Sequence, residues 1–139
     1  MKRLLTAAAA ALIAAGMLSA DHHLTKYERI ASVHDLMADI VKPNMDKLGE
    51  MRKAGGPQDE NQWKQAHRAA SVLGEGIQLS MMGGRVKDDA WADGGNQSIQ
   101  GAKDAMAAAK AMDSAAWLKA SGAIGGGCRT CHKVHKPKE

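Results

Sequence analysis

The chain has 139 residues, 45% of them hydrophobic, and a formal net charge of +4 from 19 basic and 15 acidic residues. Only 3% of the residues are aromatic, with three Trp, one Tyr and no Phe. This length fits one ordinary domain, and its core must be built largely from Ala, Met and Leu, which favour helices over strands. The composition therefore predicts an all-α fold and argues against a β-sandwich or barrel. Nucleic-acid binding is also disfavoured, because the basic residues form no dense run and do not alternate with aromatic ones.

Residues 1–20 have the features of a secretory signal peptide. Lys2 and Arg3 precede an apolar, Ala-rich stretch over residues 4–18, and small residues suited to cleavage follow it. The stretch is too short to span a bilayer comfortably, so we do not expect it to remain as a membrane anchor. After its removal, residues 21–139 keep 17 basic and 15 acidic residues, a net charge of +2. The expected product is an exported, periplasmic protein of one domain.

The first predicted helix covers residues 24–52. Apolar residues recur at helical spacing on one of its faces: Ile30, Val33, Met37 and Ile40. Pro43 lies inside this helix and predicts a kink or a local break just before it, because proline cannot donate a backbone hydrogen bond. The Gly-Gly-Pro sequence at 55–57 ends the helix.

The second predicted helix covers residues 59–82 and is followed by a loop over residues 83–95 that contains Trp91. The apolar stripe of this helix consists of Trp63, Ala66, Ala70, Leu73 and Ile77. The third predicted helix covers residues 96–112. Either Asp113 or Ser114 can cap the N-terminus of the fourth predicted helix. Four amphipathic helices with short connections predict an antiparallel four-helix bundle.

The fourth helix carries the sequence Cys128-Arg129-Thr130-Cys131-His132, which reads C-x-x-C-H. This pattern is typical of covalent haem attachment. The two thiols add to the two vinyl groups of one haem, and the adjacent histidine becomes an axial ligand of the iron. A disulfide or a thiol redox pair would use the same cysteines, and zinc would need further ligands that the sequence does not supply at matching spacing. The sequence therefore predicts one covalently attached haem c.

Three consecutive glycines, residues 125–127, directly precede the motif. They predict either a frayed helix or a close approach of the backbone to the haem.

Several stretches, together with the position of C-x-x-C-H near the end of the chain, resemble a known family. Residues 36–40 (Leu-Met-Ala-Asp-Ile) and 44–48 (Asn-Met-Asp-Lys-Leu) are similar to two segments of that family's first helix, with one extra residue between them. Residues 121–125 and the surroundings of Trp91 are similar to two further segments. The family is that of the class II cytochromes c, the cytochromes c′ and their low-spin relatives. The resemblance implies a four-helix bundle with the haem attached near its C-terminal end.

In this family the residue on the distal side of the haem comes from the first helix, so the resemblance implies that Met37 is the sixth ligand of the iron. His34 is the alternative ligand, Met45 is a further rival that is better explained as a core residue, and an iron with no sixth ligand is another alternative. The family commonly has an arginine near a haem propionate. Val33 occupies the expected position here, so the resemblance transfers that role only to Arg29, one turn earlier.

These expectations describe a periplasmic monohaem cytochrome that carries single electrons between redox partner proteins through His132 and Met37. No combination of nucleophile and base suggests an enzyme. Homodimers occur in the family, so a homodimer is an open expectation. The alternative function belongs to a five-coordinate haem protein that binds nitric oxide or carbon monoxide, as the cytochromes c′ do. A haem in the core also explains the shortage of aromatic residues and predicts that the protein folds poorly without it.

Overall fold

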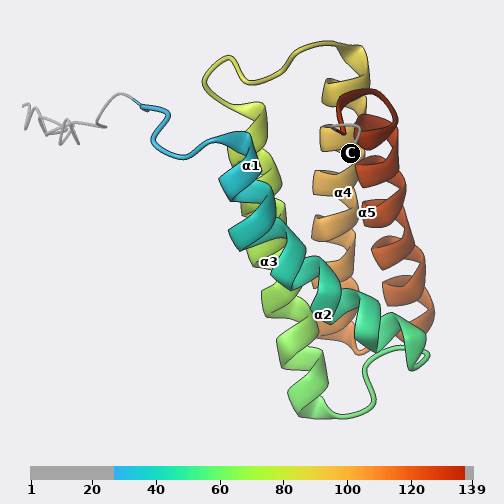
Figure 1. Ribbon diagram of the computed structural model, residues 1–139. Coiled ribbons are helices and arrows are strands. Elements are labelled where there is room, and N and C mark those ends of the chain that lie inside the picture. The colour runs from blue at the N-terminus through green and yellow to red at the C-terminus, as the bar shows by residue number, and fades with distance from the viewer. Residues whose placement is uncertain (1–26, 137–139) are drawn as a thin grey trace, which may run out of the picture.

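The computed structural model describes residues 27–136, and the predicted signal peptide lies outside them. The described residues form helices and no β-strand, which confirms the all-α prediction (Figure 1). The elements are α1 (Val33–Asp35), η1 (Leu36–Val41), α2 (Lys42–Lys53), α3 (Glu60–Met81), α4 (Asp89–Ala111) and α5 (Ser114–His135). None of the described helices combines the length and the apolar character that crossing a membrane would require.

The first helical stretch begins at Val33, nine residues later than the sequence predicted. Ser32 is its N-cap and forms a capping box with Asp35: the Asp35 N–H donates to Ser32 Oγ, and the Ser32 N–H donates to Asp35 Oδ2. This pair satisfies backbone donors that an uncapped start would leave free. Ile30, predicted on the buried stripe, precedes the cap and is 96% exposed. The prediction was wrong here because apolar spacing extended past a strong capping signal.

The expected disturbance before Pro43 takes the form of a π-helical turn rather than a break. In η1 the hydrogen bonds span five residues, and the N–H of Lys42 donates to the carbonyl of Met37. Pro43 has no N–H to donate, and its ring crowds the carbonyl four residues earlier, so the wider turn relieves a clash in an otherwise continuous helix. Leu36 and Val41, five residues apart, are both buried as a result.

The second predicted helix agrees closely with α3, which Asp59 caps through a hydrogen bond from the Gln62 N–H. The predicted apolar stripe of this helix is buried along its whole length.

The predicted loop over residues 83–95 is wrong in its second half, because α4 already begins at Asp89. Asp88 caps this helix by accepting from the N–H of Trp91, so Trp91 lies in the first turn and is only 6% exposed. Gly94 and Gly95, taken as loop residues, are buried inside the helix. Both sit at close contacts where a side chain would collide with a neighbour, which accounts for glycine inside this helix.

Helices α3, α4 and α5 lie side by side, and consecutive helices run in opposite directions (Figure 1). The α4–α5 contact is close, because a Cβ at Gly101 would lie 2.9 Å from the backbone N of Ile124, and one at Gly94 would lie 2.7 Å from the carbonyl of Gly127. Helix α5 continues unbroken through residues 125–127, so the expected fraying does not occur. Gly127 instead lets the backbones of α4 and α5 approach each other.

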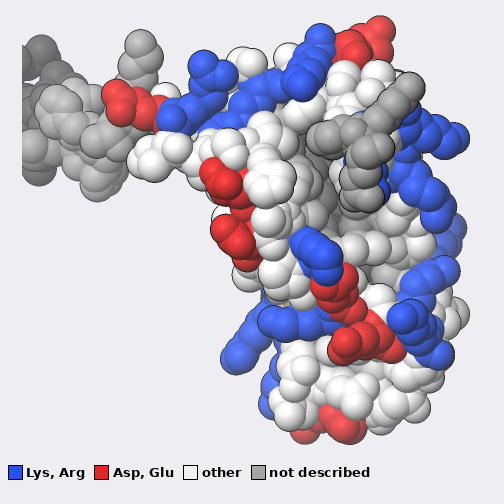
Figure 2. Space-filling view, viewed as in Figure 1, with Lys and Arg blue, Asp and Glu red and all other residues white. Residues whose placement is uncertain are grey.

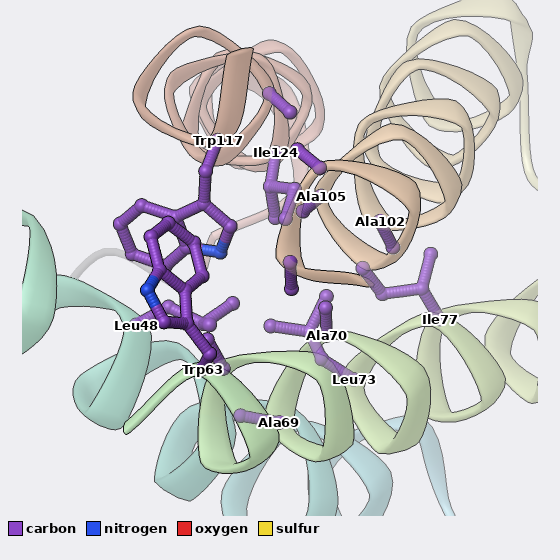
Figure 3. Close-up of a cluster of buried hydrophobic side chains, with 14 of the residues drawn as sticks. Leu48, Trp63, Ala69, Ala70, Leu73, Ile77, Ala102, Ala105, Trp117 and Ile124 are labelled. Carbon is purple, nitrogen blue, oxygen red and sulfur yellow. The ribbon is translucent and has the colours of Figure 1, made fainter. Parts of the chain in front are cut away.

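The hydrophobic core fills the space between α2, α3, α4 and α5 (Figure 3). Trp63 and Trp117 meet edge to face with ring centroids 6.4 Å apart, and Leu48, Leu73 and Ile124 pack with them. Asp113 caps α5 through the Ala116 N–H, which settles the choice between the two predicted caps. The two tryptophans provide the bulk that the alanines around them lack.

Candidate functional site

A cavity of about 150 Å³ lies between η1, the end of α3, the start of α4 and the end of α5. Its walls are mostly apolar or small residues from these four elements and from α1. They include Val33, Met37, Val41, Ile77, Ser80, Met81, Trp91, Gly94, Gly95, Ser98, Gly127, Cys128, Cys131, His132 and His135. The cavity therefore joins parts of the chain that lie about 100 residues apart in the sequence.

Helix α5 contributes the complete C-x-x-C-H motif to one wall of the cavity. Residues three and four apart lie on the same helix face, which is why Cys128, Cys131 and His132 all reach the same space. Both cysteines are free thiols and form no disulfide. Burial raises the pKa of both thiols above the ordinary value, and the nearby charge of Asp88 adds to the effect at Cys131.

Ser98 of α4 supports the more buried of the two cysteines. Its hydroxyl lies 3.1 Å from the carbonyl of Ile124, to which it donates, and 3.9 Å from Cys128 Sγ. This contact opposes the rise in the Cys128 pKa that burial causes. Ser98 is itself only 1% exposed, so the Cys128 side chain rests against a fixed polar group.

The first helical stretch supplies Met37 to the same cavity, between Val33 and Val41. His34, the predicted alternative ligand, points away: its side chain is 88% exposed, and its ring lies 3.6 Å from the Asp35 carboxylate. Arg29 is exposed beside the turn at Gly83 and does not line the cavity. Of the residues predicted as ligands or contacts, the structure thus brings together the two cysteines, His132 and Met37, and leaves His34 and Arg29 outside.

A second thioether that the sequence analysis missed also lines the cavity. Met81 of α3 packs against Gly95 of α4, where an added Cβ would lie 2.8 Å from the methionine Cε. Met81 is four residues after Ile77, so an extension of the predicted stripe of that helix by one turn would have found it.

A contact between the start of α4 and the end of α5 closes the rim of the cavity. His135 Nε2 lies 2.9 Å from Asp88 Oδ1, and the His135 ring packs against the Trp91 ring with centroids 5.1 Å apart. The hydrogen bond with His135 lowers the pKa of Asp88, and the N–H of Trp91 has the same effect. The indole N–H of Trp91 donates to the carbonyl of Ser80, which links α4 to α3. Asp88 therefore holds both the start of α4 and the end of α5.

Arg85 fastens the segment before α1 to the end of α3. Its guanidinium donates to the carbonyls of Ala31 at 2.8 Å and Leu79 at 3.1 Å, and also to the Tyr27 hydroxyl. This buried arginine had no signal in the helical pattern, because it lies in the connection between α3 and α4.

The donor set of the cavity fits a haem, because two thiols, an imidazole and a thioether are the groups that attach and ligate haem in c-type cytochromes. The volume corresponds to about five water molecules, which is less than a porphyrin needs. A haem would therefore need more room than the cavity has in this structure; His132, the residue of the motif that would hold the iron, is exposed. Within residues 27–136 no three His, Cys, Asp or Glu side chains gather to hold a bare metal ion.

No protein family, curated protein or solved structure matches the chain. The likeness to class II cytochromes c consequently rests on the residues quoted above.

Proposed function

We propose that the protein is an exported, monohaem c-type cytochrome of the class II kind, a four-helix bundle that carries single electrons. One observation carries the proposal: Met37 of η1 and the C-x-x-C-H residues of α5 line the same cavity. The motif predicts covalent haem attachment, and the thioether provides a sixth ligand from a different element.

Four residues of the cavity would hold the haem in this proposal. Cys128 and Cys131 hold the haem through thioether bonds, His132 is the proximal ligand, and Met37 is the distal ligand. The bound haem supplies the one-electron Fe(III)/Fe(II) couple, and a methionine ligand favours the reduced state. Apolar residues such as Ile77 keep water away from the distal side.

The proposed protein is a carrier rather than an enzyme, and it works in the periplasm after loss of residues 1–20. Figure 2 shows Lys and Arg side chains along the outer edge of α5, near the end that bears the motif. Redox partners with an acidic surface would be attracted to this edge.

The visible spectrum of the haem-loaded protein tests the proposal. We expect sharp low-spin bands in the reduced protein and no change on addition of carbon monoxide. Met37→Ala should produce a high-spin haem that binds carbon monoxide, because no other first-helix donor faces the cavity. Met81→Ala is the matched control and should keep the low-spin spectrum. A change with Met81→Ala but not with Met37→Ala would contradict the assignment of the ligand.

The second candidate function is binding of nitric oxide or carbon monoxide by a five-coordinate haem. It is favoured by Val33 and Val41, which flank Met37 and would leave an apolar distal pocket if the thioether did not ligate. A wild-type reduced protein that is high-spin and shifts its spectrum with carbon monoxide would support this function instead.

A further inference from the structure

Compared with a regular α-helix, the π-helical turn changes which residues of the first helical stretch face the cavity. Val33, Met37 and Val41 all line it, at intervals of four residues. In an α-helix, residues four apart are offset by about 40° around the axis, so three of them would spread over about 80°. The π turn of η1 holds more residues per turn, and the step from Met37 to Val41 therefore falls just short of a full turn. As a result, Val33 and Val41 lie on nearly the same side of the helix, with Met37 between them along its axis.

The π turn also packs against Gly76 of α3, which has no side chain. A Cβ at Gly76 would lie 2.7 Å from Ile40 Cγ2 and 3.0 Å from Val41 Cγ2. Gly76 is buried, and its neighbour Ile77 lines the cavity beside Met37. The absence of a side chain at Gly76 therefore sets how close η1 lies to α3.

We infer that Gly76 is a positioning residue for Met37: by seating the π turn of η1 against α3, it fixes the distance and direction from which the thioether reaches the distal side of the site. This inference rests on the proposed function. The atoms nearest to a Cβ at Gly76 belong to Ile40 and Val41, so Gly76 acts on Met37 through these two residues.

The test compares three glycine-to-alanine variants of the haem-loaded protein. Gly76→Ala adds a methyl group that must push η1 outward. Gly74→Ala is the control on the same helix, since its Cβ would meet Ala102 of α4 at 3.1 Å and leaves η1 untouched. Gly49→Ala is the control on α2, where nothing lies within 4 Å. We measure the haem content, the low-spin bands and the fraction of reduced haem that binds carbon monoxide.

With haem content unchanged, we expect Gly76→Ala to raise the fraction that binds carbon monoxide by about tenfold or more, the effect of a modest loss of ligand binding energy. Both controls should behave as the wild type. The double variant Ile40→Ala/Gly76→Ala removes the Ile40 methyl group that lies closest to the added Cβ. The contact with Val41 at 3.0 Å remains, but a shift of a few tenths of an ångström relieves it, so the double variant should recover most of the low-spin spectrum. This rescue also provides the test if Gly76→Ala alone fails to fold.

Three outcomes overturn the inference. The first is a Gly76→Ala protein with an unchanged low-spin spectrum. The second is an equal loss of low-spin haem in Gly74→Ala, which would indicate general loosening of α3. The third is a double variant that loads haem but stays high-spin. Failure of the proposed function is distinguishable, because it appears in the wild type itself as a high-spin spectrum.

Discussion

Asp88 is the residue that joins two elements at the rim of the cavity, since it caps α4 and bonds to His135 of α5. Its role is local and electrostatic, so it can be separated from packing by a substitution of the same shape. Asn at this position keeps the helix cap but loses the charge.

Replacement of Asp88 by Asn should therefore change how stability depends on pH. The native pKa of Asp88 is lowered, chiefly by the hydrogen bond with His135. Its contribution to stability is thus present at pH values above the ordinary aspartate pKa and is lost as the pH falls through the lower native value. Denaturant unfolding should be measured between about pH 6 and pH 2. Near pH 6 the wild type should have a higher free energy of unfolding than Asp88→Asn, and near pH 2 the two values should converge. Parallel curves would show that the charge of Asp88 contributes nothing.

Among the elements, α3 could be predicted almost residue by residue, because Asp59 is a strong cap and its apolar stripe is regular. The start of α4 could not, because Gly94 and Gly95 look like loop residues until the neighbouring helix is in place. Only Pro43 and the extra residue between segments 36–40 and 44–48 indicated a disturbance where the π turn lies. Neither feature specifies whether a helix breaks, bends or widens. The motif and Met37 could be placed in the site from sequence, and Met81 lies one turn beyond the predicted stripe of α3. Trp91 could not be placed there, because the predicted loop hid the first turn of α4.

The contact between α4 and α5 also depends on Gly101, which does not line the cavity. Gly101→Ala should lower the free energy of unfolding by about 1–3 kcal/mol, as overpacking of a core does, because its Cβ would lie 2.9 Å from the backbone N and 3.0 Å from Cγ1 of Ile124. Gly49→Ala has open space around its Cβ and should stabilise α2 by about 0.5–1 kcal/mol. Urea unfolding of both variants checks the pair. A stabilised Gly101→Ala protein would mean that α4 and α5 are not in close contact there.

At the scale of the whole molecule, the tryptophan core and the cavity share the same helices but are built differently. The core combines the two rings of Trp63 and Trp117 with many alanines, whereas the cavity is lined by the ring of Trp91, thioethers, thiols and glycines. The cavity therefore contains the sulfur and imidazole groups that the proposed cofactor would use, and the core does not.

The variant Cys128→Ala/Cys131→Ala, which cannot attach haem, should accordingly unfold more easily than the loaded wild type. We expect the free energy of unfolding to fall by at least about 3 kcal/mol, because an attached cofactor acts as a ligand whose effective concentration is far above its dissociation constant. Hydrogen exchange should show the loss at the start of α4 and the end of α5, with amides near Trp117 still protected. Equal stability of the two proteins would indicate that the fold does not use the cofactor.

The intact mass of the protein, secreted by a host that matures c-type cytochromes, tests the central claim most directly. We predict the mass of a chain that has lost its signal near residue 20 and gained one haem, with both thiols consumed. A chain of unmodified mass, or one lighter by two hydrogens from a Cys128–Cys131 disulfide, would contradict the claim.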